Sequence, residues 1–445
     1  MELVHVERLD HLGLIAWMIK DLGLISLIDA RLVPDEQEEI TPGEAVAGMI
    51  LNGLGFANRP LSLTPQFFTN KPLDLLVRPG VRAAMFNRFK LGRTLDEVHA
   101  YGCDLLFSEL ALAVCAQERI AQRFHHLDTT SFALSGDYVP ESDEHAICIT
   151  HGYSKDHRPD LKQAVLELLV SQDGGVPLVS QSWDGNTSDT QIFKERAEAL
   201  MVAFARSSTP RYLVADAKLY TEDTAATLAK LGFITRIPGT IKLGSQVIIQ
   251  ALAEKRWPRL AETTRYDRLE GCPDGIAQRG LLGSSQAAME RAEASLTKAQ
   301  QREWEAIEKQ LFHLHAQRFE TPEAAQAALQ ALATAWRYHQ FDTSRVIEPK
   351  RYAGQGRPTS TRPLKALEWQ MQAQVRPAQE VIEAHKQPRA CLVIGTNRPA
   401  GHVSEAEVIR AYKAPSGVEG GCRFLKAPVF FVSSLFVKKP RRIPG

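Results

Sequence analysis

Residues 124–130 read FHHLDTT, and a second stretch of similar design, YLVADAK, follows at 212–218. Each contains a short strand candidate and an aspartate: Asp128 lies within the candidate at 124–130, and Asp216 directly follows the candidate at 212–215. The two aspartates are 216 − 128 = 88 residues apart, which leaves room for a strand hairpin, a helix and a return strand. Because ligands collect at the carboxyl ends of strands in α/β sheets, we expect both carboxylates to lie side by side there.

The residues around these aspartates complete the expected sheet. Residues 172–175 read QDGG, a strong signal for a hairpin turn. The other expected elements are strands over 164–170, 176–182 and 233–237, and helices over 189–204 and 221–231. This order predicts the α/β class, with a mixed sheet and helices packed on it.

The remaining sequence divides into regions of different character. Residues 1–122 read as mostly helical, with a capped helix start at Thr41-Pro42. A long charged helix over 283–319 and a second helix from Thr321 predict a helical hairpin. The predicted domains are a helical N-terminal domain over 1–122, the first part of a core over 123–240, an insertion with the hairpin over 241–390, and the end of the core over 391–445.

Two further stretches suggest contacts. Residues 78–93 carry five Lys or Arg and no acidic residue, so they form either a solvated loop and helix face or a phosphate-contacting patch. The long helix carries a coiled-coil-like apolar seam, which suits a contribution to a dimer contact. Its residues are Trp304, Ile307, Leu311 and Leu314.

Composition places the chain among ordinary globular proteins. Of its 445 residues 44% are apolar, and 53 basic against 52 acidic residues give a formal net charge of +1. These values exclude a wholly disordered chain, a collagen and a disulfide-dense mini-protein. A neutral net charge argues against nucleic-acid binding by overall charge, but it permits local basic patches.

Cysteine spacing and the length of the apolar runs indicate the cellular compartment of the protein. None of the six cysteines lies in a C-x-x-C spacing, which argues against a zinc ribbon and suits a reducing compartment. Residues 1–10 lack a signal-peptide pattern, and the apolar runs are too short to span a bilayer. We therefore expect a cytoplasmic protein without a membrane partner.

Two neighbouring carboxylates also predict a type of chemistry. Asp128 and Asp216 would raise each other's pKa, and a divalent cation relieves such repulsion. A few hard oxygen ligands suit Mg²⁺ or Mn²⁺, and two such ions can clamp the attacking and leaving oxygens of a phosphoryl transfer. The alternative is that each aspartate only caps a helix or a turn.

Four segments of the core, together with residues 412–439, resemble a known family. They read HLDTT at 126–130, HGYSKDHRPD at 151–160, WDGNTSD at 183–189 and LVAD at 213–216. Here the chain resembles bacterial insertion-sequence transposases with a DDE triad, in the group whose third carboxylate lies in a Tyr-x2-Arg-x3-Glu-x6-Lys signature. The resemblance implies an RNase H-like mixed sheet flanked by helices, with a helical N-terminal domain and a largely helical insertion before the third acid. Residues 1–120 resemble the family more loosely.

By this resemblance, Glu419 is the third acid of the triad. Tyr412 precedes it by seven residues and Lys426 follows it by seven, as the signature requires. The signature arginine is replaced by Pro415, and a proline inside a helix costs about 3 kcal/mol or more, so we expect a break or kink there. Val429–Arg442 resembles the middle of family sequences, so we expect a C-terminally truncated copy with an unpacked apolar tail.

The resemblance also implies a function. The chain would be a DNA transposase that cuts transposon ends and joins the freed 3′-hydroxyls to target DNA, with two Mg²⁺ or Mn²⁺ ions held by Asp128, Asp216 and Glu419. Its partners would be double-stranded inverted repeats and target DNA, bound by a homodimer at the nucleoid. The expected DNA contacts are Tyr412, Arg423 and Lys426 near the cut, and Arg351 and Arg357 in a basic loop of the insertion.

Two other functions stay open. Pro415 and the short C-terminus suit a catalytically inactive remnant that still binds DNA. An RNase H-like nuclease would cut nucleic acid without joining strands. For the basic residues, the alternative to DNA contact is an ordinary solvated surface.

Overall fold

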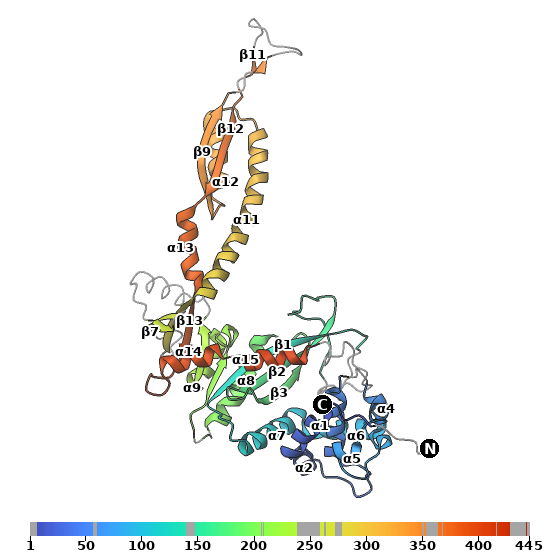
Figure 1. Ribbon diagram of the computed structural model, residues 1–445. Helices are drawn as coiled ribbons and strands as arrows, with labels where there is room; N and C mark the ends of the chain where they lie inside the picture. Colours follow the sequence, from blue (N-terminus) through green and yellow to red (C-terminus); the bar gives the residue numbers. More distant parts are fainter. Residues whose placement is uncertain are drawn as a thin grey trace. The chain divides into compact units, whose positions relative to one another are not determined.

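Figure 1 shows a computed structural model of the chain, which divides into two compact units. Unit 1 comprises Met1–Arg236, Glu270–Arg279 and Ile394–Gly445, and unit 2 comprises Ile237–Leu269 and Gly280–Val393. The structure describes residues 7–56, 60–138, 147–205, 207, 209–237, 259–261, 264–271, 278–348, 351–352, 364–366, 368–414, 416–427 and 442.

The N-terminal part of unit 1 is a cluster of helices, which confirms the expected helical region. Its elements are α1 (Leu12–Asp21), α2 (Leu24–Asp29), α3 (Pro42–Gly53), η1 (Leu61–Leu63), α4 (Thr64–Phe68), α5 (Leu73–Leu76), η2 (Ala83–Phe86), α6 (Arg88–Tyr101) and α7 (Cys103–Gln117). Thr41 begins α3 with a capping box, in which its hydroxyl accepts the Glu44 N–H and the Glu44 carboxylate accepts the Thr41 N–H. Leu51, Phe68 and Phe86 are almost completely buried among these helices.

No single helix within the described residues is long and apolar enough to span a membrane. Only α6 and α7 taken together reach the required length and composition, and they are bent by 85° where they meet.

The core of unit 1 is a mixed sheet flanked by helices, as the sequence predicted (Figure 1). Its strands are β1 (Phe124–Leu134), β2 (Lys162–Ser171), β3 (Pro177–Trp183), β4 (Tyr212–Ala215), β5 (Phe233–Ile237) and β13 (Cys391–Thr396), and its helices are α8 (Asp189–Ala205), α9 (Glu222–Lys230), α14 (Glu405–Lys413) and α15 (Ser416–Leu425). β1 pairs antiparallel with β2 and parallel with β4, and β4 pairs parallel with β5.

Within unit 1 the strand order is β3-β2-β1-β4-β5-β13. Three further strands belong wholly or mostly to unit 2: β6 (Arg259–Ala261), β7 (Thr264–Gly271) and β8 (Gln278–Ser285). At the centre, Leu213 of β4, Phe233 of β5 and Ile192 of α8 are fully buried. Short continuous apolar runs are typical of such covered parallel strands, and β4 and β5 have the bounds that the sequence predicted.

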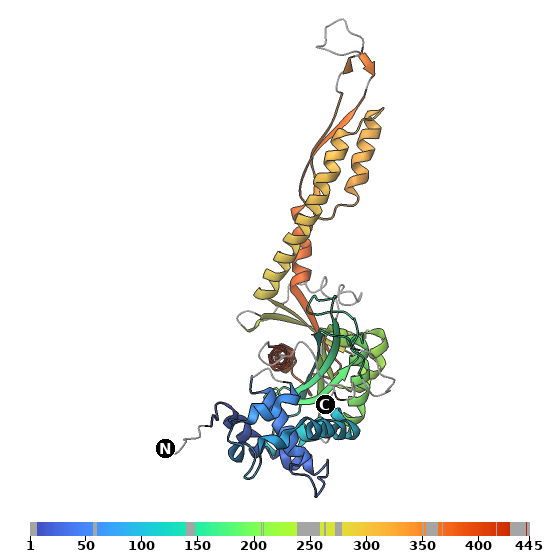
Figure 2. The same cartoon turned by 90° about the vertical axis from the view of Figure 1, so that its right-hand side faces the viewer.

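Unit 2 contains a helical hairpin and a two-stranded ribbon. α11 (Gln286–Ala316) and α12 (Pro322–Ala333) lie side by side in both views, and α13 (Gln379–Ala390) packs along α11 (Figures 1 and 2). β9 (His339–Ile347) pairs antiparallel with β12 (Gln370–Pro377), and β10 (Arg351–Tyr352) with β11 (Leu364–Ala366). The sequence predicted the helices that correspond to α11 and α12, but neither α13 nor the ribbon.

The apolar seam of α11 is buried inside unit 2. Ile307, Leu311 and Leu314 are 8% exposed or less, and they pack against Leu329 of α12 and Met371 of β12. The apolar face is therefore used within one chain. Ile307, Leu311 and Leu314 are therefore not available for a dimer contact, and the dimer itself stays a prediction.

Candidate active site

The pairing of β1 with β4 sets Asp128 and Asp216 opposite one another. Phe124 pairs with Tyr212, an offset of 212 − 124 = 88 residues, and His126 pairs with Val214 at the same offset. The two aspartates are also 88 residues apart, and Asp216 directly follows the last residue of β4. Residues at equivalent positions of parallel neighbours project from the same face of a sheet. The register therefore places both carboxylates on one face, at neighbouring positions.

The electrostatics of Asp128 agree with this placement. Burial raises the pKa of Asp128, and the negative charges of Asp216 and Asp189 raise it further. The backbone N–H of Thr129, which donates to Asp128 Oδ1 at 2.7 Å, and the ammonium of Lys155 oppose that rise. Three carboxylates therefore share one environment, and two lysines lie within it.

Asp189, the first residue of α8, is the third of these carboxylates. Its side chain is 12% exposed. The Thr129 hydroxyl donates to Oδ1 at 2.5 Å, Lys155 Nζ lies 3.2 Å from Oδ1, and Lys218 Nζ forms a short hydrogen bond to Oδ2. Burial alone would raise the pKa of Asp189, but the hydrogen bonds from Lys218 and Thr129 and the two ammonium charges outweigh it and lower the pKa. Asp189 is thus an ionised side chain whose oxygens are occupied by donors.

Asp216 also caps a turn. Its Oδ1 accepts the backbone N–H of Lys218 at 2.9 Å, where η3 (Ala217–Leu219) begins. The capping alternative therefore holds for one oxygen of Asp216. The cap fixes the backbone that carries both Asp216 and Lys218.

Helices α14 and α15 cover the adjoining surface. Val418 and Cys422 of α15 pack on Leu168 and Val170 of β2. Burial raises the pKa of the Cys422 thiol to about 11, and the charge of Asp128 adds to that rise. α15 therefore lies beside Asp128.

Two residues of the expected signature have contacts near the aspartates. Tyr412 of α14 is partly buried, and its pKa is raised by burial and by the charge of Asp216, against a lowering effect of Arg236. Lys426 Nζ lies 2.8 and 3.0 Å from the two carboxylate oxygens of Asp156. Asp156 is the neighbour of Lys155, so this ion pair ties the end of α15 to the segment that reaches the site.

The structure does not gather all the predicted site residues. Glu419 and Arg423 are exposed on α15. Among the described residues no three carboxylate, histidine or cysteine side chains come close enough to hold a metal ion together. Arg351 begins β10, and Arg357 and Pro415 lie outside the described residues, as does most of Val429–Arg442.

Sequence reasoning missed the roles of Thr129, Lys155, Asp189 and Lys218. All four stand within or next to the segments that resemble the transposase family. Their spacing along the chain gives no sign that they meet. The sequence offered one clue. Each of three polar segments that follow predicted strands contains one of the charged residues, namely Lys155, Asp189 or Lys218.

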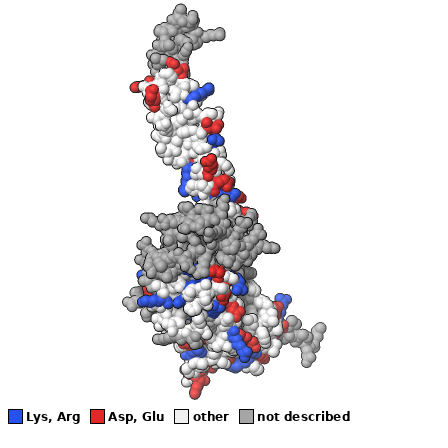
Figure 3. All heavy atoms as spheres, turned by 90° about the vertical axis from the view of Figure 1, so that its left-hand side faces the viewer, with Lys and Arg blue, Asp and Glu red and all other residues white. Residues whose placement is uncertain are grey.

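The basic stretch at 78–93 is largely paired with acidic residues. Arg78 forms an ion pair with Glu44, and Lys90 Nζ lies 2.6 Å from Glu38, with a side chain that is 5% exposed. A buried, paired ammonium is not available to a phosphate. On the face shown in Figure 3, basic and acidic side chains are interspersed, which agrees with a net charge of +1.

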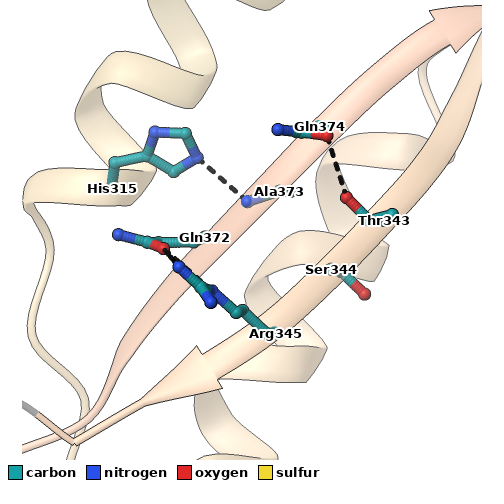
Figure 4. Close-up of a pocket in the computed structure, with 7 residues that line it drawn as sticks. All are labelled: His315, Thr343, Ser344, Arg345, Gln372, Ala373 and Gln374. Atoms are coloured by element: carbon teal, nitrogen blue, oxygen red, sulfur yellow. Dashed lines mark hydrogen bonds between the residues drawn. The ribbon is translucent and has the colours of Figure 1, made fainter.

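A separate hollow of about 530 Å³ lies in unit 2 at the β9–β12 ribbon (Figure 4). His315 Nε2 accepts the backbone N–H of Ala373 at 3.1 Å, and Arg345 donates to Gln372 Oε1 at 3.0 and 3.1 Å. Its lining residues are His315, Thr343, Ser344, Arg345, Gln372, Ala373 and Gln374. None of the predicted site residues lines it.

Comparisons with known proteins give distant similarities. Residues 4–112 match a family described as a domain of unknown function, DUF4277. No curated protein matches the chain. Among solved structures the chain is similar to the cryo-EM structure of a piggyBac transposase synaptic complex with hairpin DNA, at 10% sequence identity and a TM-score of 0.30. That alignment covers 62% of this chain and 57% of the other, so the chain spans less than two thirds of that transposase chain.

Proposed function

We propose that the chain is a metal-dependent DNA transposase of the insertion-sequence type. The observation that carries this proposal is the β1–β4 register, which sets Asp128 opposite Asp216. A second observation supports it. The four core segments that resemble the transposase family meet at this pair, through Thr129, Lys155, Asp189 and Asp216 itself.

The residues at the pair fit a hard divalent cation. Asp128 and Asp216 offer carboxylate oxygens, and their mutual repulsion is what Mg²⁺ or Mn²⁺ would relieve. We assign the third ligand position to Glu419, because α15 packs beside Asp128 and already brings Cys422 into the field of that carboxylate. When bound, the metal would polarise a phosphodiester and lower the pKa of an attacking water.

The reaction proposed is two phosphoryl transfers. In the first, water attacks a phosphorus atom at the element's end and the bond to the 3′-oxygen breaks, which leaves a 3′-hydroxyl. In the second, that hydroxyl attacks a phosphodiester of target DNA and displaces its 3′-oxygen. The chain's part is to hold Asp128 and Asp216 in register and to supply DNA contacts. Tyr412, Arg423 and Lys426 are proposed beside the cut, and Arg351 and Arg357 in the insertion.

The first prediction is that Asp216→Asn and Asp128→Asn each remove metal-dependent strand cutting. Loss of a carboxylate ligand removes several kcal/mol of transition-state stabilisation, so the rate should fall on the order of 100-fold or more. The assay follows cutting and joining of a plasmid that carries the DNA bordering the gene, in Mg²⁺ or Mn²⁺. Asp160→Asn, at an exposed aspartate paired with Arg158, is the matched control.

The outcomes separate the proposed function from its alternatives. Activity that is unchanged in Asp216→Asn contradicts the assignment. Cutting of arbitrary nucleic acid without joined products indicates an RNase H-like nuclease instead.

A second candidate function is DNA binding without cleavage. One observation favours it: Glu419 is exposed, and the described residues offer no group of three metal ligands. In that case the wild-type chain retains the bordering DNA in a gel-shift assay but produces no cut strands in either metal.

A further inference from the structure

The two lysines beside the aspartate pair are held in different ways. Lys155 Nζ donates to Thr129 O at 2.6 Å and to Thr129 Oγ1 at 2.7 Å, and it lies 3.2 Å from Asp189 Oδ1. An ammonium has three N–H donors, and Thr129 accepts from two of them, while the charge also forms an ion pair with Asp189. Lys155 therefore pins its segment to β1 directly beside Asp128.

Lys218 has the opposite character. Its side chain is 46% exposed, and its described ammonium contact is the single short bond to Asp189 Oδ2. Its backbone N–H is held by Asp216. The ammonium is thus fixed from two sides, by the turn that Asp216 caps and by Asp189, while nearly half of the side chain stays open to a ligand.

The residues around Lys218 indicate which kind of ligand its ammonium would bind. Its ammonium is bonded to Asp189, which also accepts the hydroxyl of Thr129, the neighbour of Asp128, and its backbone N–H is bonded to Asp216. A phosphodiester that approaches Asp128 and Asp216 meets two negative charges, and it needs a cation beside them to be bound. Lysine serves as a point-charge phosphate ligand in proteins, and Lys218 follows Asp216 by two residues in the turn that Asp216 caps.

We propose that Lys218 is a phosphate-binding subsite beside Asp128 and Asp216, which contacts a phosphodiester of bound DNA. Asp189 is the anchor that aims the Lys218 ammonium, and Lys155 supports the segment beside β1 through Thr129. This inference rests on the proposed function, because it requires that the chain binds DNA at the aspartate pair.

The test is the salt dependence of DNA binding, measured in EDTA so that no strand is cut. The probe is a fluorescent duplex carrying the DNA that borders the gene. Each phosphate neutralised by the protein contributes about 0.9 to the slope of log K against log salt. Lys218→Met should reduce the magnitude of that slope by about 0.9, and Lys218→Arg should restore it. Lys218→Gln should behave as Lys218→Met does, and circular dichroism checks that each variant is folded.

The matched control is Lys230→Met. Lys230 is an exposed lysine at the last residue of α9 with no described contact to Asp128, Asp189 or Asp216, and its removal should leave the slope unchanged. If Lys218→Met binds with the wild-type slope, Lys218 is only an internal counter-ion and the phosphate subsite is refuted. If the wild-type chain binds no DNA, the proposed function and this inference are refuted together.

Discussion

Glu167 lies in the centre of β2, where its side chain is fully buried. Its charge is balanced by Arg196 of α8, whose Nη2 lies 3.2 Å from Oε2 and whose side chain is 12% exposed. Trp183 Nε1 donates to the same oxygen at 2.9 Å. Buried ion pairs are poor evidence of net stabilisation, but removing one partner leaves the other charge unpaired in the interior.

Glu167→Gln is therefore expected to destabilise unit 1 strongly. The uncompensated Arg196 should lower the free energy of unfolding by about 3–5 kcal/mol, measured by urea unfolding. Asp160→Asn serves as the control, because the exposed pair of Asp160 with Arg158 should contribute little. Equal unfolding midpoints for Glu167→Gln and the wild type would show that Arg196 finds another partner.

The candidate site could be predicted from sequence only where neighbours along the chain carry the signal. Asp128 and Asp216 were predicted because each interrupts or ends a strand pattern. Asp189 was missed as a site residue because its role depends on contacts with Thr129, Lys155 and Lys218, which come from three other segments. Such contacts arise from sheet register and loop packing, and no local pattern encodes them.

At the scale of elements, two polar segments meet through a pair of glycines. A Cβ atom on Gly185 would lie 2.0 Å from the Gln163 carbonyl oxygen and 2.5 Å from that of Thr150. A Cβ on Gly152 would lie 2.0 Å from the Gly185 oxygen. All these atoms belong to rigid backbone, so only glycine permits the approach. This contact brings together the segments that supply Lys155 and Asp189.

Gly185→Ala should force these segments apart. Overpacking against backbone costs about 1–3 kcal/mol or more, so we expect a clearly lower melting temperature. Gly401→Ala is the matched control, because a Cβ there meets nothing within 4 Å. Equal melting temperatures for Gly185→Ala and Gly401→Ala would mean that the backbone yields easily, and that the glycine contact does not position the site.

For the whole molecule, the sequence predicted the elements with the strongest local patterns. The bounds of β4 and β5 agree with the prediction, and the helical hairpin of unit 2 corresponds to α11 and α12. The β9–β12 ribbon was missed, although β12 alternates strictly: Met371 and Ala373 are buried, and Gln372 and Gln374 are exposed. This alternation of apolar residues with glutamines is itself the period-two signal of a half-buried strand, which the sequence interpretation overlooked.

The pH dependence of global stability is expected to follow from the central strand of unit 1. His125 and His126 of β1 are 1% and 4% exposed, and burial lowers the pKa of each to about 4. The ordinary value is 6.5, so between pH 6.5 and 4 the unfolded chain binds protons that the folded chain does not. Stability should therefore fall as pH falls through this window, and each histidine should contribute no further loss below its folded pKa.

The variant His125→Gln measures how much of this pH-dependent loss of stability comes from His125. From pH 7 to pH 5 one such histidine accounts for about 2 kcal/mol of unfolding free energy, so the variant should lose about that much less than the wild type over the same interval. Lost packing against Phe204, whose ring centroid lies 4.9 Å from that of His125, lowers the stability of the variant at every pH and cancels in this comparison. Urea midpoints at the two pH values provide the measurement. An identical pH-dependent loss in both proteins would mean that His125 is protonated in the folded chain, and that β1 is less enclosed than its burial indicates.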